Sequence, residues 1–351
     1  LLAVSQRRFT YLLSINISIL TGYFITIILG MSKPDRAPRT SKARGTSSKF
    51  KLGDIAVIAV IIAVVFVPTV NGRISIASNT SVIPSDWQES LMWLESSTPE
   101  TSYYSNPIEK PEYGVMSWWD YGNWIVYLAH RPVLANNFHA GVDDAARFFV
   151  TLDESEANAI LDRRNVRYVI TDMKMVKTKF SYLAKLAGED ADNFYTVQTI
   201  KTRTLQVVND RFMNTTLTKL HVSDGATLGK LRLVYESHST VAQNPEVKYV
   251  KIFEHVIGAK ITGFAAPHET VSAAANVISN RRRTFEYYNT AVANETRWYE
   301  LTVSYSTEGG PYDTRAVTPY TVRGEKSIIM KEITITEDDV VNGGEIRLDL
   351  V

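Results

Sequence analysis

The chain has 351 residues, enough for two or three domains at the usual ~100–200 residues each. Its composition of 45% hydrophobic and 21% charged residues is that of a folded protein and excludes disorder or a collagen-like repeat. The 38 basic and 37 acidic residues leave a net charge of +1, which argues against binding nucleic acid through overall charge. Cysteine is absent, so disulfides, thiolate metal sites and cysteine nucleophiles are excluded.

Two uncharged runs near the amino terminus, residues 9–31 and 55–70, predict membrane-spanning helices. A bilayer core of ~30 Å needs about 20 apolar residues, and a buried helix of a globular domain is the alternative for each run. The loop between them, residues 32–54, is rich in Lys and Arg, and the positive-inside bias assigns it to the cytoplasm. The chain after Val70 is therefore expected outside the cell, as part of a multi-pass protein of the cell membrane.

Residues 72–246 predict a mixed α/β domain. A helix is expected to begin at Ser85, with Trp87, Leu91 and Leu94 on one face. Another should begin near Asp153, followed by a short strand that ends at Asp172 and by a helix over residues 179–187.

Residues 247–351 predict a β-rich domain. Between Tyr299 and Tyr305 apolar and polar residues alternate, and Gly-rich turns follow at Gly309-Gly310 and Gly343-Gly344. The expected fold class is thus α+β, with two transmembrane helices (residues 1–31 with the outer edge, and 55–71), a mixed α/β central domain, and a β-sandwich or barrel-like domain.

The string Trp118-Trp119-Asp120-Tyr121-Gly122 carries the chemistry. It places a carboxylate beside two indole N–H donors. A serine or threonine hydroxyl both donates and accepts, so a carboxylate that takes its proton and an indole that donates to its oxygen would satisfy it completely. The alternative is an aromatic cluster that packs a domain core, with Asp120 capping a helix.

The WWDYG pentapeptide is the signature of the catalytic subunit of oligosaccharyltransferase, and the chain resembles the archaeal form, AglB, over essentially its whole length. The resemblance implies that a glycan is transferred from a dolichyl phosphate or pyrophosphate carrier to the Asn of Asn-X-Ser/Thr acceptors. It also implies that Trp118, Trp119 and Asp120 bind the acceptor Ser or Thr. A single catalytic subunit acting at the cell membrane, without nucleic acid, is expected.

A second motif of this family has an Asp, a Lys three residues later and a Met or Ile four beyond that. Asp172 matches, but Met175 and Lys179 stand in exchanged order. The resemblance makes Met175 the candidate contact for the threonine methyl group, whereas Lys179 is either part of the site or a solvated surface charge. It also assigns Arg8 to the phosphate of the lipid-linked donor, with interfacial snorkelling as the alternative.

The family's catalytic carboxylates hold a divalent cation, Mn²⁺ or Mg²⁺, and lie in external loops that would precede Leu1. The chain is therefore expected to be a carboxyl-terminal fragment with no catalytic or metal-binding residue of its own. Asp143-Asp144 could be a metal pair, although a helix cap is the simpler interpretation. The competing hypothesis, which assigns the chain to a different functional class, is a membrane-anchored adhesion or carbohydrate-binding protein.

Overall fold

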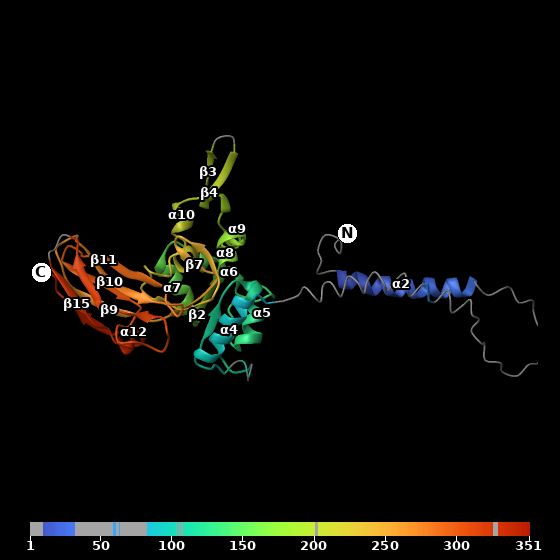
Figure 1. The fold of residues 1–351 in the computed structure, drawn as a ribbon, viewed down its shortest axis with the longest axis horizontal. Coiled ribbons are helices and arrows are strands. Elements are labelled where there is room, and N and C mark those ends of the chain that lie inside the picture. Colours follow the sequence, from blue (N-terminus) through green and yellow to red (C-terminus); the bar gives the residue numbers. More distant parts are fainter. Residues whose placement is uncertain are drawn as a thin grey trace, which may run out of the picture. The chain divides into compact units, whose positions relative to one another are not determined.

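The computed structural model describes residues 10–31, 59–60, 63, 83–102, 104, 106, 108–200, 203–325 and 329–351 (Figure 1). The chain divides into two compact units, Leu1–Val82 and Ile83–Val351. The first unit contains helix α2 (Thr10–Met31). The second contains the β-sheets and the helices that pack beside them.

The prediction of two transmembrane helices is wrong for the part of the chain that the structure describes. No helix there combines the length and the apolar character that a bilayer crossing requires. Helix α2 covers the first uncharged run, but Ser, Asn, Thr and Gly residues interrupt its apolar sequence. The hydroxyls of Thr21 and Thr26 donate to helix carbonyl groups. Apart from residues 59–60 and 63, the second run lies outside the described residues, as does the basic loop 32–54.

The second unit opens with helix α4 (Ser85–Ser97), and Trp87, Leu91 and Leu94 share its buried face as predicted. A four-stranded sheet follows, in the order β1 (Gly114–Met116), β2 (Val166–Asp172), β8 (Val250–His255) and β5 (Leu231–Glu236). Strands β1 and β2 run parallel and the other neighbours are antiparallel. Six of the seven residues of β2 are buried, so this strand is the centre of the α/β part.

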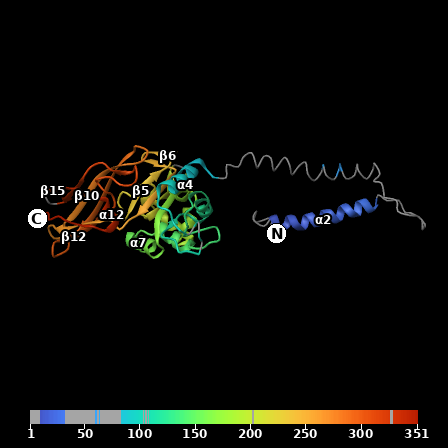
Figure 2. The same cartoon turned by 90° about the horizontal axis from the view of Figure 1, so that it is seen from below.

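Short helices surround this sheet (Figures 1 and 2): α6 (Val142–Val150), α7 (Glu154–Arg163), α8 (Met173–Lys177), α9 (Phe180–Leu186), α10 (Asp210–Met213) and α11 (Thr216–His221). Helices α7, α8 and α11 contact β2, and α4 contacts β8. A hairpin of β3 (Tyr195–Ile200) and β4 (Arg203–Val208) projects from this part of the molecule (Figure 1). A second, smaller hairpin is formed by β6 (Thr240–Gln243) and β7 (Glu246–Lys248).

The carboxyl-terminal part consists of two sheets that share one hydrophobic cluster, the arrangement of a β-sandwich. One sheet has the order β11 (Thr284–Val292), β10 (Thr270–Ile278), β14 (Tyr320–Gly324) and β15 (Met330–Ile333), with β13 (Arg315–Ala316) also paired to β10. The other has the order β12 (Trp298–Val303), β9 (Ala259–Phe264) and β16 (Glu345–Arg347), beside helix α12 (Glu337–Asn342).

The boundary between the two hydrophobic cores lies at the end of β8. Val250, Ile252 and Phe253 belong to the cluster of the α/β part, and the β-sandwich cluster begins at Val256. Strand β8 therefore completes the central sheet, although it comes after the two short strands β6 and β7.

Buried ion pairs connect the α/β part with the β-sandwich. Arg232 on β5 donates to Glu254 on β8, with a shortest contact of 2.6 Å, and to Glu337 at the start of α12, also at 2.6 Å. Arg283, just before β11, makes contacts of 2.6 Å with Asp224 and Glu236 of the α/β part. Because a charge removed from water must be compensated by a partner, these pairs constrain how the two parts pack.

We expect Arg232→Met to lower the free energy of unfolding by about 1.5–3 kcal/mol, because it removes one of the two guanidinium partners of the buried Glu254, which keeps Arg167 at 2.9 Å. The Arg232 and Glu254 side chains are only 5% and 2% exposed. Urea denaturation of the full chain measures the loss. The matched control is Arg347→Met, whose partner Asp349 is solvent-exposed, and there the change should stay below ~1 kcal/mol. Equal losses in the two variants would contradict a special role for the buried pairs.

Candidate functional site

The WWDYG segment forms a tight turn directly after β1. Trp119–Tyr121 make one 3-10 turn, and a helical segment over residues 122–129 continues it. The hydroxyl of Ser117 donates to the carbonyl of Ile170 on β2 at 2.9 Å and so fixes the start of the turn to the central strand. Gly122 is required by space, because a Cβ atom there would lie 2.6 Å from the carbonyl oxygen of Ala135.

Asp120 has one occupied and one open carboxylate oxygen. The indole N–H of Trp118 donates to Oδ2 at 2.9 Å, and the ammonium of Lys179 contacts the same oxygen at 2.6 Å. Within the described residues Oδ1 accepts no hydrogen bond, and the Asp120 side chain is 38% exposed. The carboxylate is therefore held in place from one side and can accept a further hydrogen bond from the other.

The Lys179 side chain lies against the WWDYG turn and is largely shielded from solvent. Its ammonium lies 4.4 Å from the centre of the Tyr121 ring and 5.7 Å from that of Trp118, distances typical of cation–π contacts. Its side chain is only 22% exposed. Sequence spacing leaves open whether Lys179 is part of a site or a solvated charge, and in the fold its ammonium contacts the Asp120 carboxylate.

Asp172 is the buried anchor of the site. Its Oδ2 accepts hydrogen bonds from the Tyr121 hydroxyl at 2.7 Å and from the Trp87 indole at 3.0 Å, and its Oδ1 caps α8 by accepting from the backbone N–H of Met175 at 2.8 Å. The side chain is fully buried. Burial raises the pKa of Asp172, although the three hydrogen bonds oppose the shift. Burial and the neighbouring Asp172 charge raise the pKa of Tyr121, so its hydroxyl stays a donor.

The remaining predicted residues have different surroundings. Met175 is fully buried in the hydrophobic cluster. The Trp119 ring lies beside that of His139 in a tilted arrangement, with ring centres 4.7 Å apart, and its buried indole N–H has no partner among the described atoms. Arg8 lies outside the described residues. The structure thus brings Trp118, Asp120 and Lys179 into contact, with Asp172 one layer below.

Trp87 belongs to the site, yet sequence reasoning assigned it only to the core-facing side of a helix. It donates to Asp172 from 85 residues away, and its ring lies 4.2 Å from that of Tyr121. Its position on an apolar face carried no signal of this role, because a tryptophan that packs and one that also donates have the same helical spacing.

Among the described residues no group of three His, Asp or Glu side chains is placed to hold a metal ion. Asp143 and Asp144 lie in the first turn of α6, and Asp144 is paired with Arg163 at 3.0 Å and with Arg164. These contacts occupy the Asp144 carboxylate with guanidinium groups. The described residues therefore do not fit a divalent cation.

Two family models match this chain. The model of the AglB core domain matches residues 84–176, which carry the WWDYG turn and Asp172. The model of the archaeal glycosylation protein B long peripheral domain matches residues 258–346, the β-sandwich. The chain belongs to the AglB family of archaeal oligosaccharyltransferases.

Among curated relatives in this family, dolichyl-phosphooligosaccharide-protein glycotransferase 1 of Archaeoglobus fulgidus is 34% identical over 254 residues, covering 67% of this chain and 41% of the relative. Two solved structures of the Archaeoglobus fulgidus oligosaccharyltransferase are similar at 26% identity. The complex with Zn and sulfate has a TM-score of 0.72 and covers 85% of this chain and 50% of that one. The complex with an inhibitory peptide and a dolichol-phosphate has a TM-score of 0.71 and covers 88% and 47%. The chain spans about half the length of these AglB proteins.

We expect Tyr121→Phe to destabilise the protein by roughly 1.5–3 kcal/mol, because it removes a hydroxyl that donates to the buried carboxylate of Asp172. Urea denaturation measures the effect. Tyr182→Phe is the matched control, since Tyr182 is 46% exposed, and it should be neutral within error. A neutral Tyr121→Phe would mean that the Trp87 and Met175 donors suffice and that Tyr121 does not anchor the turn.

Proposed function

We propose that the chain supplies the acceptor-binding site of an oligosaccharyltransferase, which transfers a glycan from a dolichyl phosphate or pyrophosphate carrier to the Asn of Asn-X-Ser/Thr sequons. The observation that carries the proposal is the open Oδ1 of Asp120, on a carboxylate fixed from its other oxygen by Trp118 and Lys179. The solved relative that binds an inhibitory peptide and a dolichol-phosphate supports both kinds of ligand.

The proposed recognition uses both properties of a hydroxyl. The hydroxyl of the acceptor Ser or Thr donates a hydrogen bond to Oδ1 of Asp120, and its oxygen accepts one from an indole N–H of the Trp118-Trp119 pair. The Trp119 indole has no partner among the described atoms, and a buried unsatisfied donor costs about 1–3 kcal/mol. An acceptor oxygen that reaches it would recover this cost. A residue without a hydroxyl would leave both groups unpaired, which is the basis of strong discrimination.

Lys179 and Asp172 act in this proposal as positioning residues. Lys179 pairs with the Asp120 carboxylate and orients it, while Asp172 holds Tyr121 and α8 in place. Met175, fully buried in this structure, supports the wall behind α8, and it would contact a threonine methyl group only through a local rearrangement. Arg8 remains the proposed contact for the donor phosphate.

We place the enzyme at the outer face of the cell membrane, where a lipid-linked donor resides, as a single catalytic subunit. The divalent cation, Mn²⁺ or Mg²⁺, would be bound by residues other than those described and would act as a Lewis acid when present. A membrane-anchored adhesion protein without catalytic role is the less favoured hypothesis, because adhesion gives no reason for the Asp120 arrangement.

In the full chain, Asp120→Ala is expected to weaken binding of an Asn-X-Thr peptide about 10- to 100-fold, the equivalent of losing one charged hydrogen bond worth ~1.5–3 kcal/mol. Fluorescence polarisation with labelled Asn-X-Thr and Asn-X-Ala peptides measures it. The wild-type chain should prefer the Thr peptide, and the variant should bind both equally weakly.

Asp144→Ala provides the matched control, since it also removes an ion-paired carboxylate, and it should leave the preference for Thr intact. Urea denaturation of each variant separates binding from folding. A folded Asp120→Ala protein that still prefers Asn-X-Thr would overturn the proposal.

A further inference from the structure

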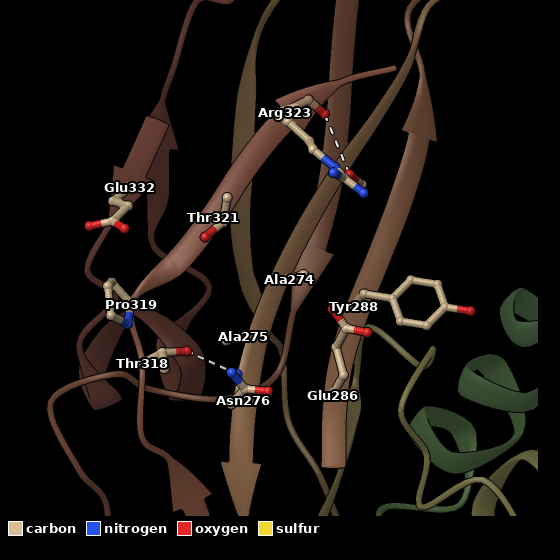
Figure 3. A pocket seen from close by; sticks show the side chains of 11 residues that line it. Ala274, Ala275, Asn276, Glu286, Tyr288, Thr318, Pro319, Thr321, Arg323 and Glu332 are labelled. Carbon is tan, nitrogen blue, oxygen red and sulfur yellow. Dashed lines mark hydrogen bonds between the residues drawn. The ribbon is translucent and has the colours of Figure 1, made fainter. Parts of the chain in front are cut away.

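The outer face of the five-stranded sheet of the β-sandwich carries a trough of about 560 Å³ (Figure 3). It runs across β11, β10, β14 and β15, and no residue of the WWDYG turn lines it. The lining residues are Ser272, Ala274, Ala275, Asn276, Glu286, Tyr288, Thr318, Pro319, Thr321, Arg323 and Glu332.

The hollow follows from the order of side chains along β10. Val271, Ala273, Ala275 and Val277 are buried in the sandwich, so the alternate residues Ser272, Ala274 and Asn276 face outward. Ala274 is paired with Tyr288 on β11 and with Thr321 on β14. A small residue between larger neighbours on both adjacent strands leaves a depression in the middle of the sheet.

The walls of the trough offer an aromatic ring and separate hydrogen-bonding groups. Tyr288 lines the trough and is 42% exposed, and its ring extends outward from β11, on the side away from Thr321 and Glu332 (Figure 3). Within the described residues, the side chains of Arg323, Glu286 and Glu332 form no ion pair, although other opposite charges of the same domain do pair, such as Lys260 with Glu300 at 3.0 Å. These groups therefore remain available to a ligand.

We propose that this trough binds a neutral oligosaccharide. Carboxylates accept hydrogen bonds from hydroxyl groups, a guanidinium donates hydrogen bonds to oxygens, and an amide does both, so the lining matches a ligand with many hydroxyl groups. An exposed tyrosine ring offers an apolar face to the C–H side of a sugar ring. Two carboxylates beside one guanidinium disfavour a strongly anionic ligand, and the polar walls disfavour an apolar one.

The dimensions agree with this class of ligand. Four neighbouring strands span about 14 Å at ~4.8 Å per strand, roughly the length of two or three sugar rings. The glycan could be free, attached to a lipid carrier or attached to a protein, and the recognition chemistry is the same for all three. This site does not depend on the sequon-binding site, because the two share no residue.

The test titrates the full chain with four trisaccharides: mannotriose, cellotriose and chitotriose as neutral probes, and trigalacturonic acid as the acidic one. Protein-observed NMR or calorimetry should show saturable binding of at least one neutral probe and at least tenfold weaker binding of the acidic one. Tyr288→Ala and Arg323→Met should each weaken the neutral probe tenfold or more, and Tyr288→Trp should retain it.

Tyr182→Ala and Arg347→Met serve as matched controls on exposed residues of the same types, and they should leave the affinity unchanged. To identify the source of the glycan, the titration is repeated with the sugar that binds, attached to a dolichyl phosphate in vesicles and, separately, to a short glycopeptide. The form that binds most tightly is the natural ligand. The proposal is overturned if no neutral probe saturates the protein, if the acidic probe binds as well, or if Tyr288→Ala and Arg323→Met bind like the wild type. Failure of this test leaves the preference for Asn-X-Thr peptides untouched, so the two sites are judged separately.

Discussion

The candidate site depends on one buried carboxylate. Asp172 lies at the end of the central strand β2 and is removed from water completely. Such burial is costly unless hydrogen bonds replace hydration. The donors that replace it come from three separate segments, namely the helix of Trp87, the turn of Tyr121 and the start of α8. Because one small group must satisfy all three, it constrains their relative positions. The open carboxylate of Asp120 is a consequence, since its neighbour Tyr121 is the residue so held.

Next to this anchor, the two carboxylate oxygens of Asp120 differ in their hydrogen bonds. Both Trp118 and Lys179 contact Oδ2, so Oδ1 keeps its capacity to accept. An ion pair that used both oxygens would leave no acceptor for a ligand, whereas this one leaves Oδ1 free to accept a hydrogen bond. Lys179 also covers the face of Tyr121 at 4.4 Å, which links the upper layer of the site to the lower one. In our proposal the acceptor hydroxyl completes an arrangement that the protein has left one hydrogen bond short.

The β-sandwich is joined to the α/β part by compensated charges, not by apolar contact alone. Lys251, fully buried on β8, donates to Asp224 and to the carbonyl of His221, and Arg283 reaches the same carboxylate from the sandwich. Removing one partner leaves another charge in a medium that solvates it poorly. The two hydrophobic clusters therefore behave as one compact unit. The trough on the outer sheet and the site at the WWDYG turn are two surfaces of the same compact unit, each with its own chemistry.

The sequence by itself determined the family, through the WWDYG motif. It also determined the amphipathic face of α4, strand β2 and the alternating strand β12, because these depend on local periodicity. It misjudged the apolar amino-terminal run, since absence of charge is not the same as continuous apolar character. The rest was decided by tertiary structure. Nothing in the spacing of Asp172, Met175 and Lys179 said which of them would be buried and which would reach Asp120. Trp87 gave no local sign that its indole would find a carboxylate 85 residues away. Contacts of this kind form only when strands and helices distant in sequence have packed, and their donors and acceptors are selected by position in space.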